Sequence, residues 1–307
     1  MRIAVSTHPG RKRRHNEDTY VVEPPLFAVA DGMGGAKAGE VASGLAAGAL
    51  KEGGGDGTSG EERVVELIQE ANRRVFRRAS EDREASGMGT TMTVALVEDD
   101  RVIFGHVGDS RAYLIREGRI EQLTDDHSLV AELVRSGRLS PEEAESHPQR
   151  SVITRAVGTE ADVDVDTFEI HPEPGDLFLI CSDGLTDMVD DETIIRAVEK
   201  HRDNLDEAAK ALVGAANRVG GEDNITVVFF EVTDGEPLED TAVTAAAPAV
   251  DGEVDEDTLS ELEGVPTIET REPEEKPKRR GRALPVAAAL AALLFAAAAI
   301  LWLLDNL

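Results

Sequence analysis

Acidic residues at the ends of strand-like segments, mostly beside glycine, carry the chemistry that this sequence offers. They are Asn16-Glu17-Asp18, Asp31-Gly32, Gly108-Asp109-Ser110, Ser182-Asp183-Gly184 and Glu222-Asp223-Asn224. A carboxylate that ends a buried apolar strand is costly to bury unless it is paired or binds a metal. If several such strand ends converge, their oxygens form a site suited to Mg²⁺ or Mn²⁺ rather than to zinc. The sequence therefore predicts a divalent metal centre.

Taken one at a time, these motifs are weak signals, because Asp-Gly also marks ordinary turns. Three of them follow apolar runs, which are Phe27–Ala30, Phe104–Val107 and Leu177–Ile180. Five such motifs within residues 1–233 favour a shared metal site over five unrelated turns.

The elements that must position these acids alternate between strands and helices. Strands are expected at residues 1–7, 26–30, 162–170, 177–180 and 225–232, and helices at 36–52, 61–80, 127–136, 141–146, 191–200 and 205–219. The segments 90–97, 101–107, 111–116 and 120–123, with short turns between them, predict an antiparallel meander. Hairpins without a regular βαβ repeat indicate an α+β fold whose sheets are mostly antiparallel.

Composition narrows the class of protein. The chain has 307 residues and a net charge of −29, so a nucleic-acid partner is not expected. A single cysteine, Cys181, excludes an intrachain disulfide, and no Cys/His spacing suggests zinc. Nothing in the sequence demands more than a monomer.

The last quarter of the chain differs from the rest. Residues 234–275 hold 15 acidic residues against a single arginine and are expected to form a disordered linker. Residues 276–282 are basic, and residues 283–304 form an uncharged run of 22 residues, long enough for a transmembrane helix of about 33 Å. Basic residues favour the cytoplasmic side of a membrane, and here they precede the apolar run. The sequence therefore predicts a single-pass cell-membrane protein with residues 1–233 in the cytoplasm and a short outer tail at 305–307. The helix would contact membrane lipid, and the basic segment could also bind anionic headgroups.

The order of the motifs resembles one enzyme family. Residues 13–18 (RRHNED), followed by DGMGG, GDSR, SDGLTD and DNIT, are similar to the type 2C, metal-dependent PPM-class protein phosphatases, and most similar to the bacterial branch. The resemblance covers residues 1–233 and implies a catalytic domain with a central antiparallel β-sandwich flanked by helices on both faces. It also implies a centre of two Mn²⁺ or Mg²⁺ ions at one end of that sandwich.

Roles for the acids follow from this resemblance, motif by motif. It implies that Asp31 bridges the two metals and that the Gly32 carbonyl binds one of them. Asp183 and Asp223 would bind the other. Asp109 is similar to the residue that, with Asp183, holds a weaker third metal in bacterial members.

The resemblance also implies roles for Glu17, Asp18 and Arg13, and it leaves the general acid open. Glu17 and Asp18 are neighbours on a strand and should point to opposite faces, so the resemblance implies that one binds metal directly and the other through water. Arg13 matches the phosphate-binding arginine. Two metals would lower the pKa of a water that attacks phosphorus in line. Eukaryotic members have a histidine where this chain has Met33, which leaves the acid that protonates the leaving group open between a metal-bound water and His15.

The resemblance implies an enzyme that hydrolyses phosphoserine and phosphothreonine in proteins and so reverses a membrane-associated serine/threonine kinase. Two alternatives remain at this point. One is a catalytically silent domain that binds phosphoproteins, which the presence of Arg13, Asp31, Asp183 and Asp223 disfavours. The other is a phosphatase that controls an anti-sigma-factor antagonist, although such proteins usually carry added sensory domains.

Overall fold

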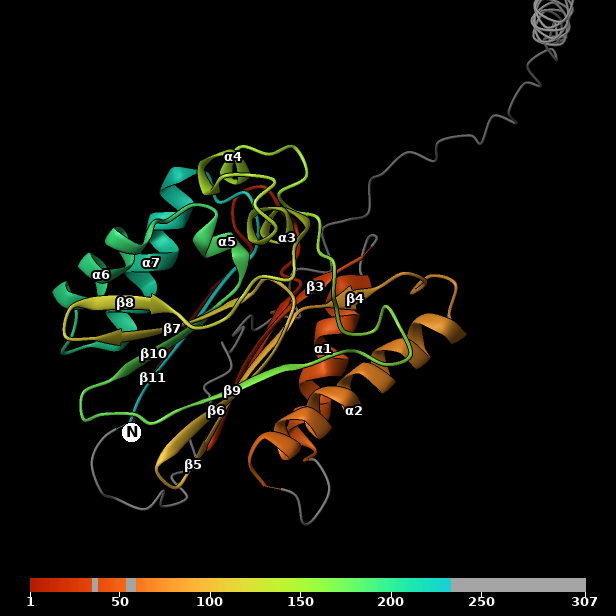
Figure 1. The fold of residues 1–307 in the computed structure, drawn as a ribbon, viewed down its shortest axis with the longest axis horizontal. Coiled ribbons are helices and arrows are strands. Elements are labelled where there is room, and N and C mark those ends of the chain that lie inside the picture. The colour runs from red at the N-terminus through yellow and green to blue at the C-terminus, as the bar shows by residue number, and fades with distance from the viewer. Residues whose placement is uncertain (35–37, 54–58, 233–307) are drawn as a thin grey trace, which may run out of the picture. The chain divides into compact units, whose positions relative to one another are not determined.

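The computed structural model describes residues 1–34, 38–53 and 59–232 of the 307-residue chain. The chain divides into two compact units, Met1–Val243 and Thr244–Leu307, and the second unit lies outside the described residues. The described part contains two antiparallel sheets with helices on their outer faces (Figure 1). This arrangement confirms the predicted sandwich.

The first sheet runs in the order β1-β11-β10-β7-β8. Its strands are β1 (Arg2–His8), β7 (Arg111–Arg116), β8 (Arg119–Gln122), β10 (Leu177–Cys181) and β11 (Ile225–Glu231). The outer face of this sheet packs on α6 (Asp191–Lys200) and α7 (Leu205–Val219) through a cluster of buried apolar side chains. The short α5 (Asp183–Thr186) follows β10 directly.

The second sheet runs in the order β2-β3-β5-β6-β9, and β4 (Gly89–Thr90) pairs with β3. Its strands are β2 (Asp18–Glu23), β3 (Leu26–Met33), β5 (Met92–Glu98), β6 (Arg101–Val107) and β9 (Asp166–Ile170). Helices α1 (Ala38–Lys51) and α2 (Gly60–Glu81) cover its outer face (Figure 1).

Phenylalanine side chains fill the space between the two sheets. Phe230 of β11 stacks on Phe27 of β3 with ring centroids 4.4 Å apart, and on Phe178 of β10 at 5.0 Å. Phe178 then meets Phe104 of β6 at 5.8 Å. Because these rings come from both sheets, they fix how closely the sheets approach each other.

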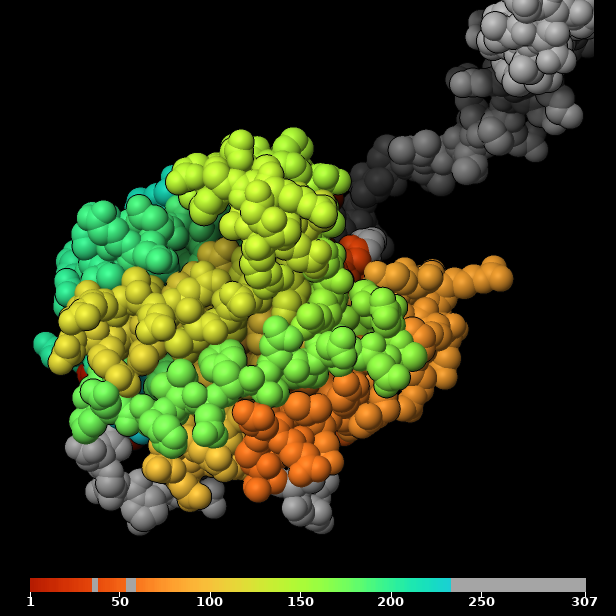
Figure 2. Space-filling view, in the orientation of Figure 1, coloured from red at the N-terminus to blue at the C-terminus, as the bar shows by residue number. Residues whose placement is uncertain are grey.

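A segment between β8 and β9 lies outside the two layers. It contains α3 (Leu129–Arg135) and α4 (Pro141–Glu145) and forms the yellow-green lobe at the top of Figure 2. The start of α4 is specified locally, because Ser140 and Glu143 form a reciprocal capping box and proline occupies the first helical turn. We call residues 125–155 the flap segment below.

The predicted four-stranded meander is wrong. β5 pairs with β6 and β7 pairs with β8, but the two pairs belong to different sheets. Residues Gly108–Ser110 carry the chain from one sheet to the other, and Gly108 has φ +113°, which a side chain would strain. The strand predicted at 162–170 is also too long, since β9 begins at Asp166.

No helix in the described part of the chain is both long and apolar enough to cross a bilayer. The predicted linker (234–275), basic segment (276–282), membrane helix (283–304) and tail (305–307) all lie outside the described residues.

Candidate functional site

The β2–β3 hairpin brings two of the predicted acids face to face. Asp18 opens β2 and is the register partner of Asp31 near the end of β3. Just beyond Asp31, Gly32 donates its backbone N–H to the Glu17 carbonyl at 3.2 Å. The second sheet therefore supplies Glu17, Asp18, Asp31 and Gly32 to one end of the sandwich.

The first sheet supplies two more acids to the same end. Asp183 follows β10, and Asp223 precedes β11. The strands are antiparallel with Cys181 opposite Val227, so the end of β10 lies beside the start of β11. A topology in which the two strands ran parallel would have separated these acids by a strand length.

Hydrogen bonds from the first sheet hold Asp18 of the second. Ser182 Oγ donates to Asp18 Oδ2 at 2.8 Å, and Thr226 Oγ1 donates to the same oxygen at 2.6 Å. Both hydroxyls are buried. These bonds close the sandwich at the acidic end.

The carboxylates of this cluster have strongly perturbed acidities. Burial raises the pKa of Asp18 to about 6 and that of Asp109 to about 7. Burial also raises the pKa of Asp31 and of Asp183 well above the ordinary value, and repulsion from neighbouring carboxylates adds to it. Removing water from the carboxylates and placing them beside one another both disfavour their charged forms.

The cluster has oxygen atoms that the protein leaves without partners. Asp18 Oδ1 and Asp183 Oδ1 are buried and accept no hydrogen bond from any described residue. Buried carboxylate oxygens of this kind are rare unless a cation or proton completes them. All donors here are oxygens, so the residues fit Mn²⁺ or Mg²⁺. Within the described ranges, no group of three or more His, Cys, Asp or Glu side chains is arranged so that it could hold a metal ion without rearrangement.

Glu17 and Asp18 point to different sides, as predicted from strand alternation. Asp18 faces the first sheet, whereas Glu17 faces the start of α1. A Cβ placed on Gly39 would lie 2.7 Å from both Glu17 Oε2 and the Gly32 carbonyl oxygen, so these two oxygens are neighbours. Because Gly39 has no side chain, α1 can approach these two oxygens. The sequence analysis gave Gly39 no role, although it lies at the end of a glycine-rich stretch that begins at Gly32.

Arg13 lies at the rim of the cluster. Its Nη2 donates to Asp223 Oδ2 at 2.7 Å, and this bond raises the pKa of the guanidinium. About half of the Arg13 side chain is exposed. Arg13 is therefore accessible from solvent next to the acids, but it forms an ion pair with Asp223, one of the predicted metal ligands. The His15 side chain is exposed.

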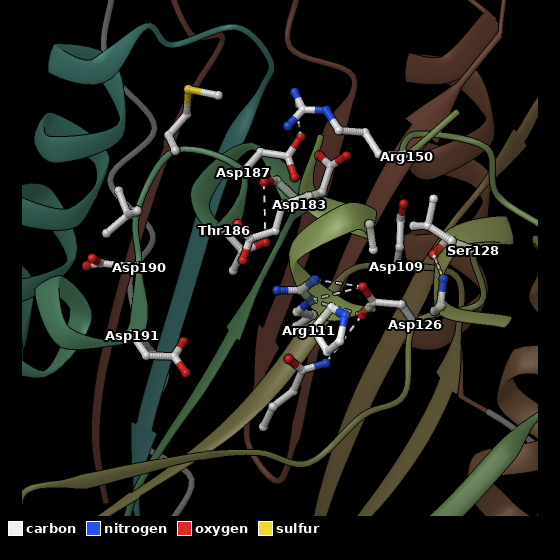
Figure 3. Close-up of a pocket in the computed structure, with 18 of the residues that line it drawn as sticks. Asp109, Arg111, Asp126, Ser128, Arg150, Asp183, Thr186, Asp187, Asp190 and Asp191 are labelled. Carbon is white, nitrogen blue, oxygen red and sulfur yellow. Dashed lines mark hydrogen bonds and ion pairs between the residues drawn. The ribbon is translucent and has the colours of Figure 1, made fainter. Parts of the chain in front are cut away.

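Asp109 belongs to the same cluster through the crossover between the sheets. Thr91 and Ser110 share a hydrogen bond between their hydroxyls at 2.8 Å, and Asp31 donates its backbone N–H to Thr91 Oγ1 at 2.9 Å. The crossover is therefore fixed to β3 beside Asp31. Asp109 and Asp183 line the same cavity (Figure 3).

Two positioning residues were missed by sequence reasoning. Asn224 donates from Nδ2 to the carbonyls of Pro9 and His15, and its Oδ1 accepts from the Glu17 backbone N–H. It thereby holds the segment that carries Arg13 and Glu17. The DNIT motif contains this residue, but only its aspartate was given a role.

His127 is the second missed residue, and it joins the flap segment to the crossover. Its Nδ1 accepts from the Gly108 N–H at 3.0 Å, and its backbone N–H donates to the Gly108 carbonyl at 2.8 Å. Its Nε2 lies 3.0 Å from Asp166 Oδ2 and 3.1 Å from Arg155 Nη1. Burial lowers the pKa of His127. A histidine without a paired ligand motif gave no signal in the sequence.

Comparison with known proteins identifies the family to which this chain belongs. The family model described as protein phosphatase 2C matches residues 12–218. A serine/threonine phosphatase stp of Listeria welshimeri is 42% identical over 242 residues, covering 75% of this chain and 96% of the relative. The serine/threonine protein phosphatase PstP of Mycobacterium tuberculosis is 40% identical over 261 residues, covering 84% of this chain and 50% of the relative.

Solved structures agree with the sequence relatives. The M. tuberculosis serine/threonine phosphatase PstP/Ppp superposes with a TM-score of 0.71 at 39% identity, over 76% of this chain and 98% of that one. A PstP catalytic domain in complex with two manganese ions gives a TM-score of 0.69 at 38% identity, over 76% of this chain and 98% of that one.

Proposed function

Because this chain belongs to the protein phosphatase 2C family and is a serine/threonine phosphatase, we propose that it hydrolyses phosphoserine and phosphothreonine in proteins with the help of two Mn²⁺ or Mg²⁺ ions. One observation carries this proposal. Carboxylates from two different sheets meet at one end of the sandwich, and two of their buried oxygens have no partner among the described residues.

The proposed ligands divide between the two sheets. Asp31 would bind both ions and the Gly32 carbonyl one of them, while Asp183 and Asp223 would bind the other. Of Glu17 and Asp18, one would bind directly and the other through water. The proximity of Glu17 Oε2 to the Gly32 oxygen supports Glu17 as a participant on that side. A third, weaker ion would lie between Asp109 and Asp183.

When bound, the ions supply positive charge for the phosphate oxygens and a water of lowered pKa. The chain's own residues orient the substrate. Arg13 would bind two phosphate oxygens in a fork, exchanging its contact with Asp223 for the substrate. Asn224 keeps the Arg13 segment in place through its bonds to Pro9 and His15. Met33 has no proton to give to the departing serine or threonine oxygen.

Phosphate release from a phosphothreonine peptide tests the proposed reaction. We expect the full chain to release phosphate with Mn²⁺, and to lose at least about 99% of that rate in excess EDTA, because the carboxylates repel one another and cannot activate water alone. Re-addition of Mn²⁺ should restore the rate. Binding of the phosphopeptide without release, at saturating Mn²⁺, would point instead to a phosphoprotein-binding domain.

We also propose a membrane location, on the strength of the sequence. Residues 1–233 would be the cytoplasmic catalytic domain, 234–275 a linker, 276–282 a basic membrane-proximal segment, 283–304 a single membrane helix and 305–307 a short outer tail. The phosphatase would act as a monomer and would oppose a membrane serine/threonine kinase, since tethering raises the local concentration of such partners.

Fractionation of cells tests the anchor. The full chain is expected in the membrane fraction after a high-salt wash, and a chain ending at residue 282 in the supernatant. High salt would release a protein that is held to the membrane by charge alone, whereas it would not release one that is anchored by a 22-residue apolar helix. Full-length protein in the supernatant would contradict the anchor.

A further inference from the structure

A groove leads away from the carboxylate cluster. It has a cavity volume of about 1240 Å³ and lies between the flap segment and the α5–α6 region. Asp109 and Asp183 are among the residues that line it. In Figure 3, Asp183 and Asp187 lie near Arg150, and Asp190 and Asp191 lie farther along the chain, where α6 begins. Because Asp183 lines the groove and also belongs to the carboxylate cluster, the groove lies next to the proposed metal site.

The lining of the groove is strongly acidic. Its charged residues are nine acids (Asp109, Asp125, Asp126, Glu145, Asp183, Asp187, Asp190, Asp191 and Glu192) and three arginines (Arg111, Arg135 and Arg150). Each arginine already faces one of the acids. Arg111 binds Asp126 through two nitrogens, and Arg150 and Arg135 lie 3.6 Å and 3.8 Å from Asp187 and Asp125. Six carboxylates therefore remain without a basic neighbour from the lining.

Four of these six have another task. Asp109 and Asp183 belong to the metal cluster. Asp190 caps α6 by accepting from the Thr193 N–H at 2.9 Å, and Glu192 pairs with Arg196 at 2.8 Å on the helix surface.

The remaining two are Asp191 and Glu145. Neither side chain has a hydrogen bond or ion pair to any other described residue, and both residues are exposed. Asp191 begins α6 on one wall of the groove, and Glu145 ends α4 on the other. Two free carboxylates thus face the same space from opposite sides.

The size and charge of the groove indicate its occupant. A volume of about 1240 Å³ exceeds that of a usual small-molecule pocket, so it suits a polypeptide segment. A phosphorylated segment is itself anionic, and an acidic groove would repel it unless the flanking residues brought positive charge. Guanidinium and ammonium groups complement carboxylates on both walls.

We propose that this groove binds the polypeptide next to the phosphorylated residue, and that Asp191 and Glu145 select segments carrying arginine or lysine. This inference rests on the proposed phosphatase function and adds its substrate preference. The ions and Arg13 would attract the phosphate, while the groove would attract the flanking cations.

Three phosphothreonine peptides of equal length, with arginine, alanine or glutamate on both sides of the phosphothreonine, test this preference. The protein is the full chain with Mn²⁺ at low salt, and the readout is kcat/KM. The variant is the double substitution Asp191→Asn with Glu145→Gln. Asp206→Asn is the matched control, because Asp206 also lies in the exposed first turn of a helix but outside the groove. Hydrolysis of p-nitrophenyl phosphate reports the reacting centre alone.

We expect the wild type to prefer the arginine peptide over the alanine peptide by about tenfold, since two exposed ion pairs contribute a few-fold each. The double variant should lower that ratio to within about twofold and leave p-nitrophenyl phosphate hydrolysis unchanged, and Asp206→Asn should change neither. Equal rates for the arginine and alanine peptides in the wild type, or an undiminished ratio in the double variant, would overturn the inference. If the wild type hydrolysed neither the peptides nor p-nitrophenyl phosphate, the proposed function itself would fail.

Discussion

Replacing Asp183 with asparagine is expected to lower Mn²⁺-dependent kcat/KM by at least about a thousandfold, equivalent to roughly 4 kcal/mol of transition-state stabilisation. Asp183 is half-buried, its Oδ1 is buried without a partner, and it stands among several other carboxylates. An amide of the same shape keeps the fold but contributes no negative charge to hold a cation. Phosphate release from a phosphothreonine peptide across a Mn²⁺ titration is the measurement, with Asp203→Asn in the exposed turn after α6 as the control.

The same substitution is expected to stabilise the metal-free protein. The pKa of Asp183 is raised in the folded state, so folding favours its protonated form. Stability in EDTA should therefore fall as pH rises from about 4, the unfolded value, through the folded pKa values of about 6 for Asp18 and about 7 for Asp109.

Asp183→Asn removes an ionisable group whose charged form is disfavoured in the folded protein by burial and by neighbouring carboxylates, so in EDTA at about pH 7.5 the variant should melt at a higher temperature than the wild type. With saturating Mn²⁺ the order should reverse, because only the wild type gains the full free energy of metal binding. Calorimetric melting in both buffers checks this. A variant that melts below the wild type in EDTA would show that Asp183 stabilises the fold without metal.

Replacing Phe230 with alanine is expected to destabilise the protein by roughly 3–5 kcal/mol. Its side chain is 0% exposed and stacks between Phe27 and Phe178, one from each sheet. Truncation would leave a cavity between two sheets that cannot easily collapse, because their acidic ends are held together by the bonds of Asp18. Urea denaturation of the Mn²⁺-loaded protein measures the loss.

Phe168→Ala is the matched control for this prediction. Phe168 is only partly buried on the edge strand β9 and stacks on a single ring, Phe104, at 5.0 Å. Its truncation should cost at least about 1 kcal/mol less, since less apolar area leaves water on folding. Equal losses at the two positions would mean that stacking across the sheets adds nothing.

Much of the fold could be predicted from the sequence because its signals are local. Helices α6 and α7 begin and end at the predicted residues, and each starts behind a side-chain cap, Asp190 or Asn204. Most of the strands were also anticipated from short apolar or alternating runs. The five acidic motifs do come together, because each follows or precedes a strand that ends on the same side of the sandwich.

What could not be predicted depends on tertiary pairing. A hairpin turn within one sheet and a connection between two sheets can have the same sequence pattern of a glycine and polar residues between two apolar runs. Only the structure shows that Gly108–Ser110 connects β6 of one sheet to β7 of the other. Alternation at 162–165 imitates a strand but has no partner strand to extend it. Helix α5 has four residues, too few for helical periodicity to register. The metal roles of the acids and Arg13 stay predictions.

The phenylalanine stack has a consequence for metal affinity. Asp18 and Asp31 belong to one sheet, whereas Asp183 and Asp223 flank strands of the other. The separation between these two pairs of acids therefore depends on the distance between the sheets, to which the aromatic layer contributes together with the hydrogen bonds of Asp18. A change of ring volume in that layer can alter the ionic radius that the site prefers while each ligand stays unchanged. Discrimination between Mn²⁺ and Mg²⁺, which differ only slightly in the bond lengths they favour, would then be a property of the hydrophobic core.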